Sequence, residues 1–356
     1  MNRSCVAVLH TSPRTVFDDY SRLLHLVSYT DAISKERDTV LNIDLSWHHF
    51  TPACSSPPWQ IDGILKTLLA DGVPRDSITA CFGSKRGVNS NKGQILNRHL
   101  QAVERHGVTV SHLSHDTTWV RYEPKAQLRV LSSVFPDGIL LPDLRMGKNT
   151  VHLTSMKTDV LSTVAGAVYT CFEGLLDEHK TDAYRFLHDA FVDALAIEQE
   201  ISPGIIAVMD GVIAGEGSCP RCPVPREKNV ILASTDPVAL DAVAASLMGF
   251  DPMAVPFIRL AHEAGLGTGD VKEIEVLGDD ISGMNFSFRI DGHTLGARLR
   301  RCEATKNGKA PSLISRFISF IYHDMYWFYA MREDFVREFK KGEWGKLFES
   351  YRKKLD

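Results

Sequence analysis

The 356-residue sequence lacks features that mark several common classes of protein. Its net charge of −4 leaves no excess of positive charge for nucleic acid or for an anionic membrane surface. No apolar run reaches the roughly 18 residues of a membrane-spanning helix. The apolar stretch near the N-terminus is too short for a secretory signal. We therefore expect a cytoplasmic protein with no nucleic-acid partner and no stable membrane insertion.

Cysteine is sparse and irregularly placed, which argues against a disulfide framework or an iron–sulfur motif. The seven cysteines are scattered, and only Cys219 and Cys222 have the C-x-x-C spacing. No second C-x-x-C completes a tetrahedral zinc site. Nearby prolines interrupt any helix that would activate a redox pair. Three interpretations remain open: structural thiols, metal ligands, or a redox or nucleophilic pair.

What the sequence does contain is an alternation of short apolar runs with amphipathic stretches. This pattern predicts an α/β fold, a mostly parallel sheet with helices on both faces. We expect one α/β body over residues 1–300, with two lobes dividing near 150–180 as an alternative. Residues 301–356 are expected to be a linker and an aromatic C-terminal helical extension. That extension would pack on the body, form a homodimer, or face a lipid or partner. The expected strands are 5–10, 39–47, 78–83, 108–113, 138–144, 205–211, 229–234 and 274–278, and the expected helices are 58–72, 97–107, 161–179, 182–200, 236–250 and 255–265.

A glycine-rich segment follows the strand expected at 205–211. We predict that this strand ends at Asp210 and that a turn containing Gly211, Gly215 and Gly217 follows. Ligands in open α/β sheets bind beyond the carboxyl ends of strands, so Asp210 and Glu216 are candidate catalytic residues. The segment does not fit the phosphate-loop or dinucleotide glycine patterns.

Other polar loops follow other expected strands and would line the same cleft. Lysine and arginine side chains there suit a carboxylate or phosphate group, and histidines and cysteines suit a metal ion. The candidate substrate-binding residues are Lys85, Arg86, Arg145, Lys148, Ser55 and Ser56. The candidate metal ligands are His48, His49, Asp210, Cys219 and Cys222. The candidate catalytic residues are Asp210, Glu216, Lys157 and Cys219.

These residues together predict an enzyme that acts on a small anionic metabolite by metal-assisted or acid/base chemistry. The expected reaction class is an isomerase or lyase, or a metal-dependent oxidoreductase, and the expected cofactor is a divalent iron or zinc ion. One alternative is a thiol redox or metal-thiolate protein that uses Cys219 and Cys222. Another is a non-catalytic protein that binds a small molecule or a partner.

Two segments resemble a known family. They are "AVMDGVIAGEG" at 207–217 and "ILASTDPVALDAVAASLMGFDP" at 231–252. With weaker similarities elsewhere, they make roughly residues 5–280 resemble the proteins of domain of unknown function 362. The resemblance implies a fold more than an activity. Some members carry ferredoxin-like cysteine clusters, which this sequence lacks. Cys219 stands where the family has glycine, and a second lysine and an asparagine after Lys157 are missing.

Overall fold

The computed structural model describes residues 3–352 apart from 84, 86, 114–115, 296, 299–300 and 302–320. Within these residues, nine strands form one sheet in the order β11-β1-β10-β9-β7-β2-β3-β4, with β8 paired to β7. Most neighbouring strands are parallel, while β10 runs antiparallel to β1 and β9. The strands are β1 (Cys5–His10), β2 (Thr39–Ile43), β3 (Ile78–Phe82), β4 (Thr109–His112), β7 (Asn149–Asp159), β8 (Thr163–Ala165), β9 (Ile205–Ser218), β10 (Cys222–Ser234) and β11 (Glu275–Gly278).

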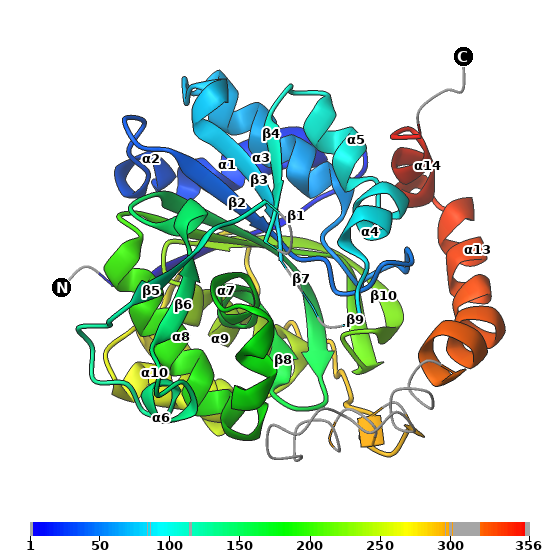
Figure 1. Ribbon diagram of the computed structural model, residues 1–356. Coiled ribbons are helices and arrows are strands. Elements are labelled where there is room, and N and C mark those ends of the chain that lie inside the picture. The colour runs from blue at the N-terminus through cyan, green and yellow to red at the C-terminus, as the bar shows by residue number, and fades with distance from the viewer. Residues whose placement is uncertain are drawn as a thin grey trace.

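Helices cover both faces of the sheet, as the sequence predicts (Figure 1). One layer is formed by α1 (Val16–Leu26), α3 (Pro58–Ala70) and α5 (His99–Glu104). The other is formed by α7 (Ala167–Leu175), α8 (Leu187–Ile201), α9 (Pro237–Met248) and α10 (Pro256–Glu263). Alternate residues of the strands enter two separate cores, as the two-residue period of a strand requires. Shorter helices are α2 (Tyr29–Ala32), α4 (Ser90–Leu96) and α6 (Leu131–Val134).

Polar caps fix the two central helices of the second layer. The Asp236 carboxylate accepts hydrogen bonds from the Val238 and Ala239 amides in the first turn of α9, as an N-cap residue does. One turn later, Asp241 accepts from the Ala167 and Val168 amides at the start of α7. Burial raises the pKa of Asp241 to about 7, although these two amide bonds oppose the shift. Asp241 therefore joins α9 to α7.

The central strand β7 was not predicted, because its residues look like a polar loop. Every residue from Asn149 to Asp159 is buried. Val151 and Leu153 enter the α1/α3 core, and Met156 enters the other. The polar members are bonded within the interior, so hydrophobic periodicity does not reveal the strand. Lys157 consequently stands on the sheet itself.

The strand expected at 138–144 does not belong to the main sheet. It is β6 (Ile139–Pro142), which pairs only with β5 (Trp119–Tyr122) in a separate hairpin. The expectation that its following loop shares the edge of the main sheet is therefore wrong.

The glycine-rich segment is strand, not turn, so that prediction is also wrong. Strand β9 continues to Ser218 and forms a long hairpin with β10. A Cβ on Gly211 would lie 2.9 Å from Val230 Cγ2 and 3.1 Å from the Val230 carbonyl oxygen. A Cβ on Gly215 would lie 3.2 Å from that of Lys157. These glycines permit close packing within the sheet. Because β9 continues through them, Asp210 lies in mid-strand and not at a strand end.

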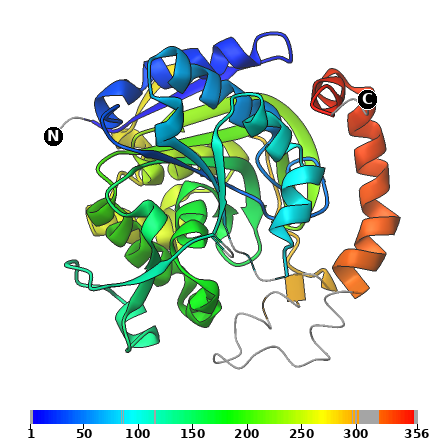
Figure 2. The ribbon, with the colours of Figure 1, turned by 45° about the horizontal axis from the view of Figure 1, so that its top comes forward.

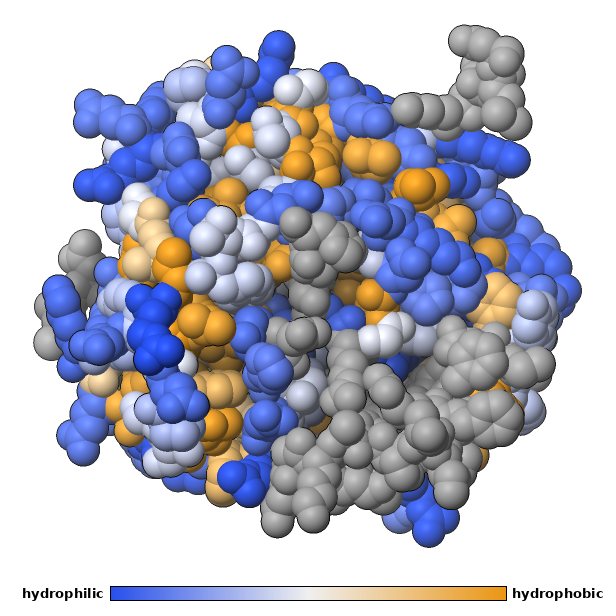
Figure 3. Space-filling view, viewed as in Figure 1, coloured by the Kyte–Doolittle hydropathy of each residue, from blue (hydrophilic) through white to orange (hydrophobic). Residues whose placement is uncertain are grey.

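From residue 321 on, the C-terminal extension is helical and runs along one side of the body in both ribbon views (Figures 1 and 2). The expected linker lies almost wholly outside the described residues. It consists of the π-helix η6 (Ile321–Arg332), α13 (Glu333–Lys341) and α14 (Glu343–Glu349). Trp344, Phe348 and Tyr351 are buried against the α1/α3 layer of the same chain. Helix α13 has a mainly hydrophilic outer surface, which is blue at the right of Figure 3.

Candidate functional site

Two lysine ammonium groups meet at one carboxylate where three parallel strands end. Asp44 follows β2 directly, Lys85 follows β3, and Lys157 lies near the end of β7. Lys85 Nζ lies 2.6 Å from Asp44 Oδ1, and Lys157 Nζ forms an ion pair with Asp44 Oδ2. This is the edge at which open α/β sheets bind ligands. The structure therefore brings together two of the predicted residues, Lys85 and Lys157, around one that was not singled out.

The side chains of the Asp44–Lys85–Lys157 cluster are almost fully buried, and their charges interact strongly. The Asp44 and Lys157 side chains are each 1% exposed, and that of Lys85 is 10% exposed. Burial alone would raise the pKa of Asp44, but the two ammonium groups outweigh it and hold this pKa well below its ordinary value. Burial alone would lower the pKa of Lys85, but Asp44, Tyr169 and Glu173 raise it. Asp44 and Lys85 therefore both stay charged at neutral pH.

Neighbouring polar groups fix the directions of the two ammonium groups. Lys157 Nζ donates 2.8 Å hydrogen bonds to the Cys54 carbonyl oxygen and to Ser155 Oγ. Lys85 Nζ donates to Ser46 Oγ at 3.1 Å. The Lys85 ammonium also lies 4.9 Å from the centre of the Tyr169 ring, which is a cation–π distance. Lys157 is thus fully committed to protein contacts, and Lys85 is the more accessible of the two.

A second lysine–carboxylate pair lies beside this cluster. Lys180, in the 3-10 helix η3 (Glu178–Phe186), forms a 3.3 Å ion pair with Glu173 of α7. Its Nζ also donates to the Glu173 carbonyl oxygen at 2.6 Å. Burial lowers the pKa of Lys180; Glu173 opposes this shift, and the nearby charge of Lys85 adds to it. With Asp44 and Glu173 as the acids, the three lysines leave one positive charge in excess.

Asp210 occupies a different environment from the one predicted. It is buried under α1 and α3, where Tyr20 and Trp59 donate to Oδ2 at 2.6 and 2.8 Å and the Val212 amide donates to Oδ1. Burial raises the pKa of Asp210 to about 6, although these three bonds oppose the shift. It lines a cavity of about 20 Å³ together with Ser55 and Ser56, room for one water molecule. The cavity is too small for a metabolite.

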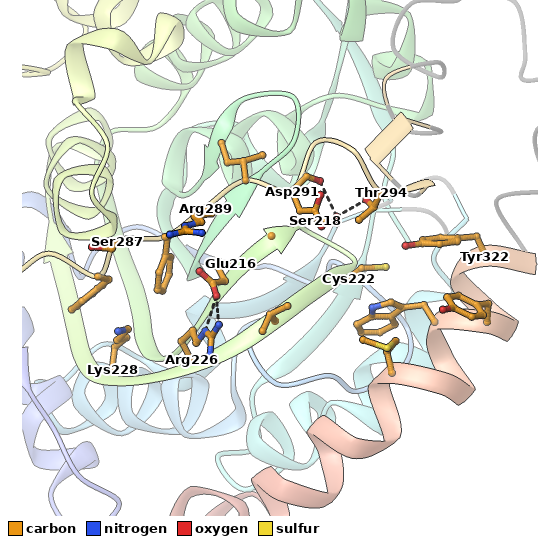
Figure 4. Close-up of a pocket in the computed structure, with 18 residues that line it drawn as sticks. Glu216, Ser218, Cys222, Arg226, Lys228, Ser287, Arg289, Asp291, Thr294 and Tyr322 are labelled. Atoms are coloured by element: carbon orange, nitrogen blue, oxygen red, sulfur yellow. Dashed lines mark hydrogen bonds and ion pairs between the residues drawn. The ribbon is translucent and has the colours of Figure 1, made fainter.

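Glu216 lies away from Lys157, on the opposite face of β9 from Gly215. It forms an ion pair with Arg226 of β10 and lines a separate pocket of about 870 Å³ (Figure 4). The expectation that Asp210 and Glu216 lie together in one catalytic cleft is therefore wrong. A regular strand would place two residues six positions apart on one face, but β9 is irregular between them. The adjacent residues Val212 and Ile213 both enter the α1/α3 core, and the register with β7 and β10 shifts there, which reverses the alternation before Glu216.

The C-x-x-C pair forms the end of the β9–β10 hairpin. Cys219 and Cys222 are both buried. Burial raises the pKa of Cys219 to about 12, so its thiol is protonated at neutral pH. The hairpin end packs on the loop after β2, where Cys54 Sγ donates to the Pro220 carbonyl oxygen at 3.1 Å. This arrangement favours the structural interpretation of these thiols.

Two predicted substrate-binding residues lie elsewhere. Arg145 is fully buried and pairs with Glu198 on α8. Lys148 precedes β7, at the amino end of that strand, and pairs with Asp38 at 3.0 Å. Both predictions assumed that the loop after β6 joins the carboxyl edge of the main sheet, and both are wrong for that reason. Arg86 lies outside the described residues.

The predicted metal ligands do not form one site. The rings of His48 and His49 lie tilted against that of Trp47, and His49 also contacts Phe328 of η6 at a ring distance of 4.2 Å. Asp210 is enclosed by Tyr20 and Trp59, as described above. In the described part of the chain, this set includes no three possible ligand atoms grouped as a metal requires.

A different buried group could hold a metal ion. The possible ligand atoms of His152, Cys171 and Glu198 lie within 4.8 Å of one another. Burial would raise the pKa of Glu198, but His152 and Arg145 lower it to about 2. A cation there would share the Glu198 carboxylate with the Arg145 guanidinium. The ionic network is already balanced, which favours a structural role. The divalent metal stays a prediction.

Sequence reasoning missed Asp44, Glu173 and Lys180 as members of the site. The signal for Asp44 was present, because this residue follows an apolar strand directly. Glu173 and Lys180 lie on helical segments with no motif, so only the fold brings them to Lys85.

Taken together, this is an α/β protein with a buried lysine–carboxylate cluster at the carboxyl edge of its parallel strands. The family described as a domain of unknown function (DUF362) matches residues 41–246, and the chain belongs to that family. The match begins before Asp44 and ends within α9, so it contains the cluster and excludes the C-terminal extension.

One curated relative extends the comparison. The chain is 28% identical over 207 residues to the thylakoid-associated protein sll1697 of Synechocystis sp. (strain ATCC 27184 / PCC 6803 / Kazusa). The aligned part is 55% of this chain and 58% of that protein's length. Among the described helices, none has the length and apolar character needed to cross a bilayer. The cytoplasmic location stays a prediction.

Proposed function

We propose that the protein is an enzyme that acts on a small metabolite bearing a carboxylate or phosphate group, bound at the Asp44–Lys85–Lys157 cluster. The observation that supports this most is the convergence of two ammonium groups on one buried carboxylate at the ligand-binding edge. Lys85, the more exposed member, would contact the anionic group directly. Asp44 would act as a positioning residue that holds both ammonium groups in place.

The arrangement favours an isomerase or lyase over a metal-dependent oxidoreductase. Removing a proton next to a carboxylate places extra negative charge on that carboxylate, and fixed cations stabilise this charge in a water-poor site. Lys85 and Lys157 are cations of this kind, and their positions are fixed before any ligand binds. Glu216 and Cys219 have no role in this proposal.

Binding can be tested before the substrate is known. Phosphate, sulfate, oxalate and citrate would be screened for their effect on the melting temperature, and the best anion measured by calorimetry. We expect one of them to stabilise the wild-type protein. Lys85→Met should weaken its binding by about tenfold or more, because a charge-assisted hydrogen bond is lost. Lys148→Met, which removes a lysine at the opposite end of β7, is the matched control and should bind as wild type.

Catalysis requires a second readout. A pool of anionic metabolites would be incubated with each protein and followed by mass spectrometry. Consumption of one compound by wild type and Lys148→Met, but not by Lys85→Met, would support an enzyme. Anion binding without consumption would instead indicate a binding protein, and equal binding by Lys85→Met would remove the site.

A further inference from the structure

A second surface of the molecule combines positive charge with exposed aromatic side chains. The 870 Å³ pocket lies between the β9–β10 hairpin, residues 286–294 and η6 (Figure 4). Lys228 and Arg289 line it from the body. Tyr322, Tyr326 and Trp327 line it from η6. The two walls therefore differ in chemistry, one cationic and one aromatic.

The cationic wall is incompletely neutralised. Three cations and two acids line the pocket, Asp291 being the second acid. Arg226 is paired with Glu216, whereas the described residues provide no ion-pair partner for Lys228 or Arg289. The Lys228 ammonium lies 4.6 Å from the centre of the Phe286 ring. The aromatic ring attracts this ammonium but does not neutralise its charge. This wall can therefore take an external anion.

The η6 helix exposes large apolar side chains. Among the described residues, nine large hydrophobic side chains are exposed, and four of them lie within eleven positions of η6. Three of these recur every five residues, Ile321, Tyr326 and Met331, a spacing that matches the hydrogen bonding of a π-helix. The exposed fractions are 41% for Ile321, 58% for Tyr326, 64% for Tyr329 and 44% for Met331.

Contacts with the body hold this helix in position. Trp327 is buried, and Phe328 packs on His49. Arg332 Nε donates to the Phe50 carbonyl oxygen at 2.6 Å. The apolar residues are thus held outward beside the cationic wall.

We propose that η6 and the cationic wall form a peripheral docking surface for an anionic phospholipid bilayer. Tyrosine suits the boundary between headgroups and acyl chains, because its ring is apolar and its hydroxyl polar. Lys228 and Arg289 supply the charge complementarity toward lipid phosphates. The contact lies on the surface of the bilayer. It is independent of the anion site at Asp44, Lys85 and Lys157, so either proposal can fail alone.

Vesicle co-sedimentation of the full-length protein tests this surface. The probes are phosphatidylcholine vesicles with and without phosphatidylglycerol. Wild type should bind only the vesicles that contain phosphatidylglycerol, and added salt should weaken binding. We expect Tyr326→Ser/Tyr329→Ser and Lys228→Gln/Arg289→Gln each to reduce the partition coefficient by about tenfold or more. The control is Ile95→Ser/Phe186→Ser, which removes two exposed apolar side chains elsewhere and should bind as wild type.

Several results would overturn the proposal. One is a wild-type protein that does not sediment with anionic vesicles, and another is a surface variant that binds as well as wild type. Circular dichroism would first confirm that each variant is folded. Sedimentation velocity tests whether the surface binds a second copy of this chain instead. A dimeric wild type and a monomeric Tyr326→Ser/Tyr329→Ser variant would show that it does and would overturn the proposal.

Discussion

The buried carboxylates of this protein differ in what compensates their charge. Two ammonium groups neutralise Asp44, so it stays ionised despite complete burial. Asp210 receives three hydrogen bonds, but none of the described cations contributes to its pKa. Burial therefore raises this pKa to about 6. Residue type and strand position suggested Asp210 as the catalytic acid. The structure instead surrounds Asp210 with hydrogen-bond donors and places two ammonium groups on Asp44. The partners of each carboxylate come from distant parts of the chain.

The raised pKa of Asp210 predicts a particular pH dependence of stability. Because the pKa in the folded protein exceeds the ordinary aspartate value of 3.8, folding favours the protonated form. This contribution is complete below the unfolded pKa and is lost as pH rises through about 6. The free energy of folding that depends on this protonation is about 3 kcal/mol in all. The asparagine in Asp210→Asn does not titrate. The free energy of unfolding of the variant, taken relative to wild type, should therefore increase by roughly this amount between pH 4 and 7.

Urea unfolding at a series of pH values would measure this difference. Asp18→Asn, which removes a surface carboxylate from α1, controls for the change in net charge. If the difference between wild type and Asp210→Asn did not vary with pH, Asp210 would titrate alike in the folded and unfolded chain, and the raised pKa would be wrong.

At the scale of elements, periodicity predicted those parts of the fold whose burial is apolar. Helices α3, α8 and α9 lie where the sequence placed them, and so do β1 and β3. Strand β7 was missed because His152, Lys157 and other polar residues are buried along it through ionic and hydrogen-bonded contacts. Strand β6 was predicted, but its partner was not. Local sequence does not specify which strands pair, and two site predictions failed for that reason.

The reassignment of the glycine-rich segment can be tested on Gly211. An added methyl would press on Val230 from inside the β9–β10 hairpin. Gly211→Ala should therefore lower the free energy of unfolding by about 1–3 kcal/mol through overpacking. Gly83→Ala is the control, because the nearest heavy atom to its Cβ would be 3.5 Å away, an ordinary contact. Chemical denaturation would compare the two. A neutral effect at Gly211 would argue for an open turn there.

At the scale of the whole molecule, the C-terminal extension uses its aromatic residues in two ways. Those of α14 and of the residues directly after it face inward: Trp344 Nε1 donates to Asn229 Oδ1 at 2.7 Å, and Tyr351 donates to Asp62 Oδ2 at 2.7 Å. Those of η6 include Tyr326 and Tyr329, which face outward. Composition alone could not separate the two sets, because both belong to one aromatic, basic stretch. The docking surface proposed above would depend on α14 to keep the extension on the body.

Trp344 is the residue on which this attachment should most depend. It is buried, and its ring centre lies 5.0 Å from that of Trp59 on α3. Truncating a buried tryptophan costs about 3–5 kcal/mol. Because the part of the extension that the structure describes adds no strand to the sheet, we expect this cost mainly as local undocking. In Trp344→Ala, amides of residues 333–349 should exchange hydrogen about a hundredfold faster, while those of β7 and β9 change little. Phe186→Ala, which truncates an exposed aromatic, should leave both groups unchanged. Equal acceleration in the sheet strands of Trp344→Ala would instead show that the extension and the α/β body unfold as one cooperative unit.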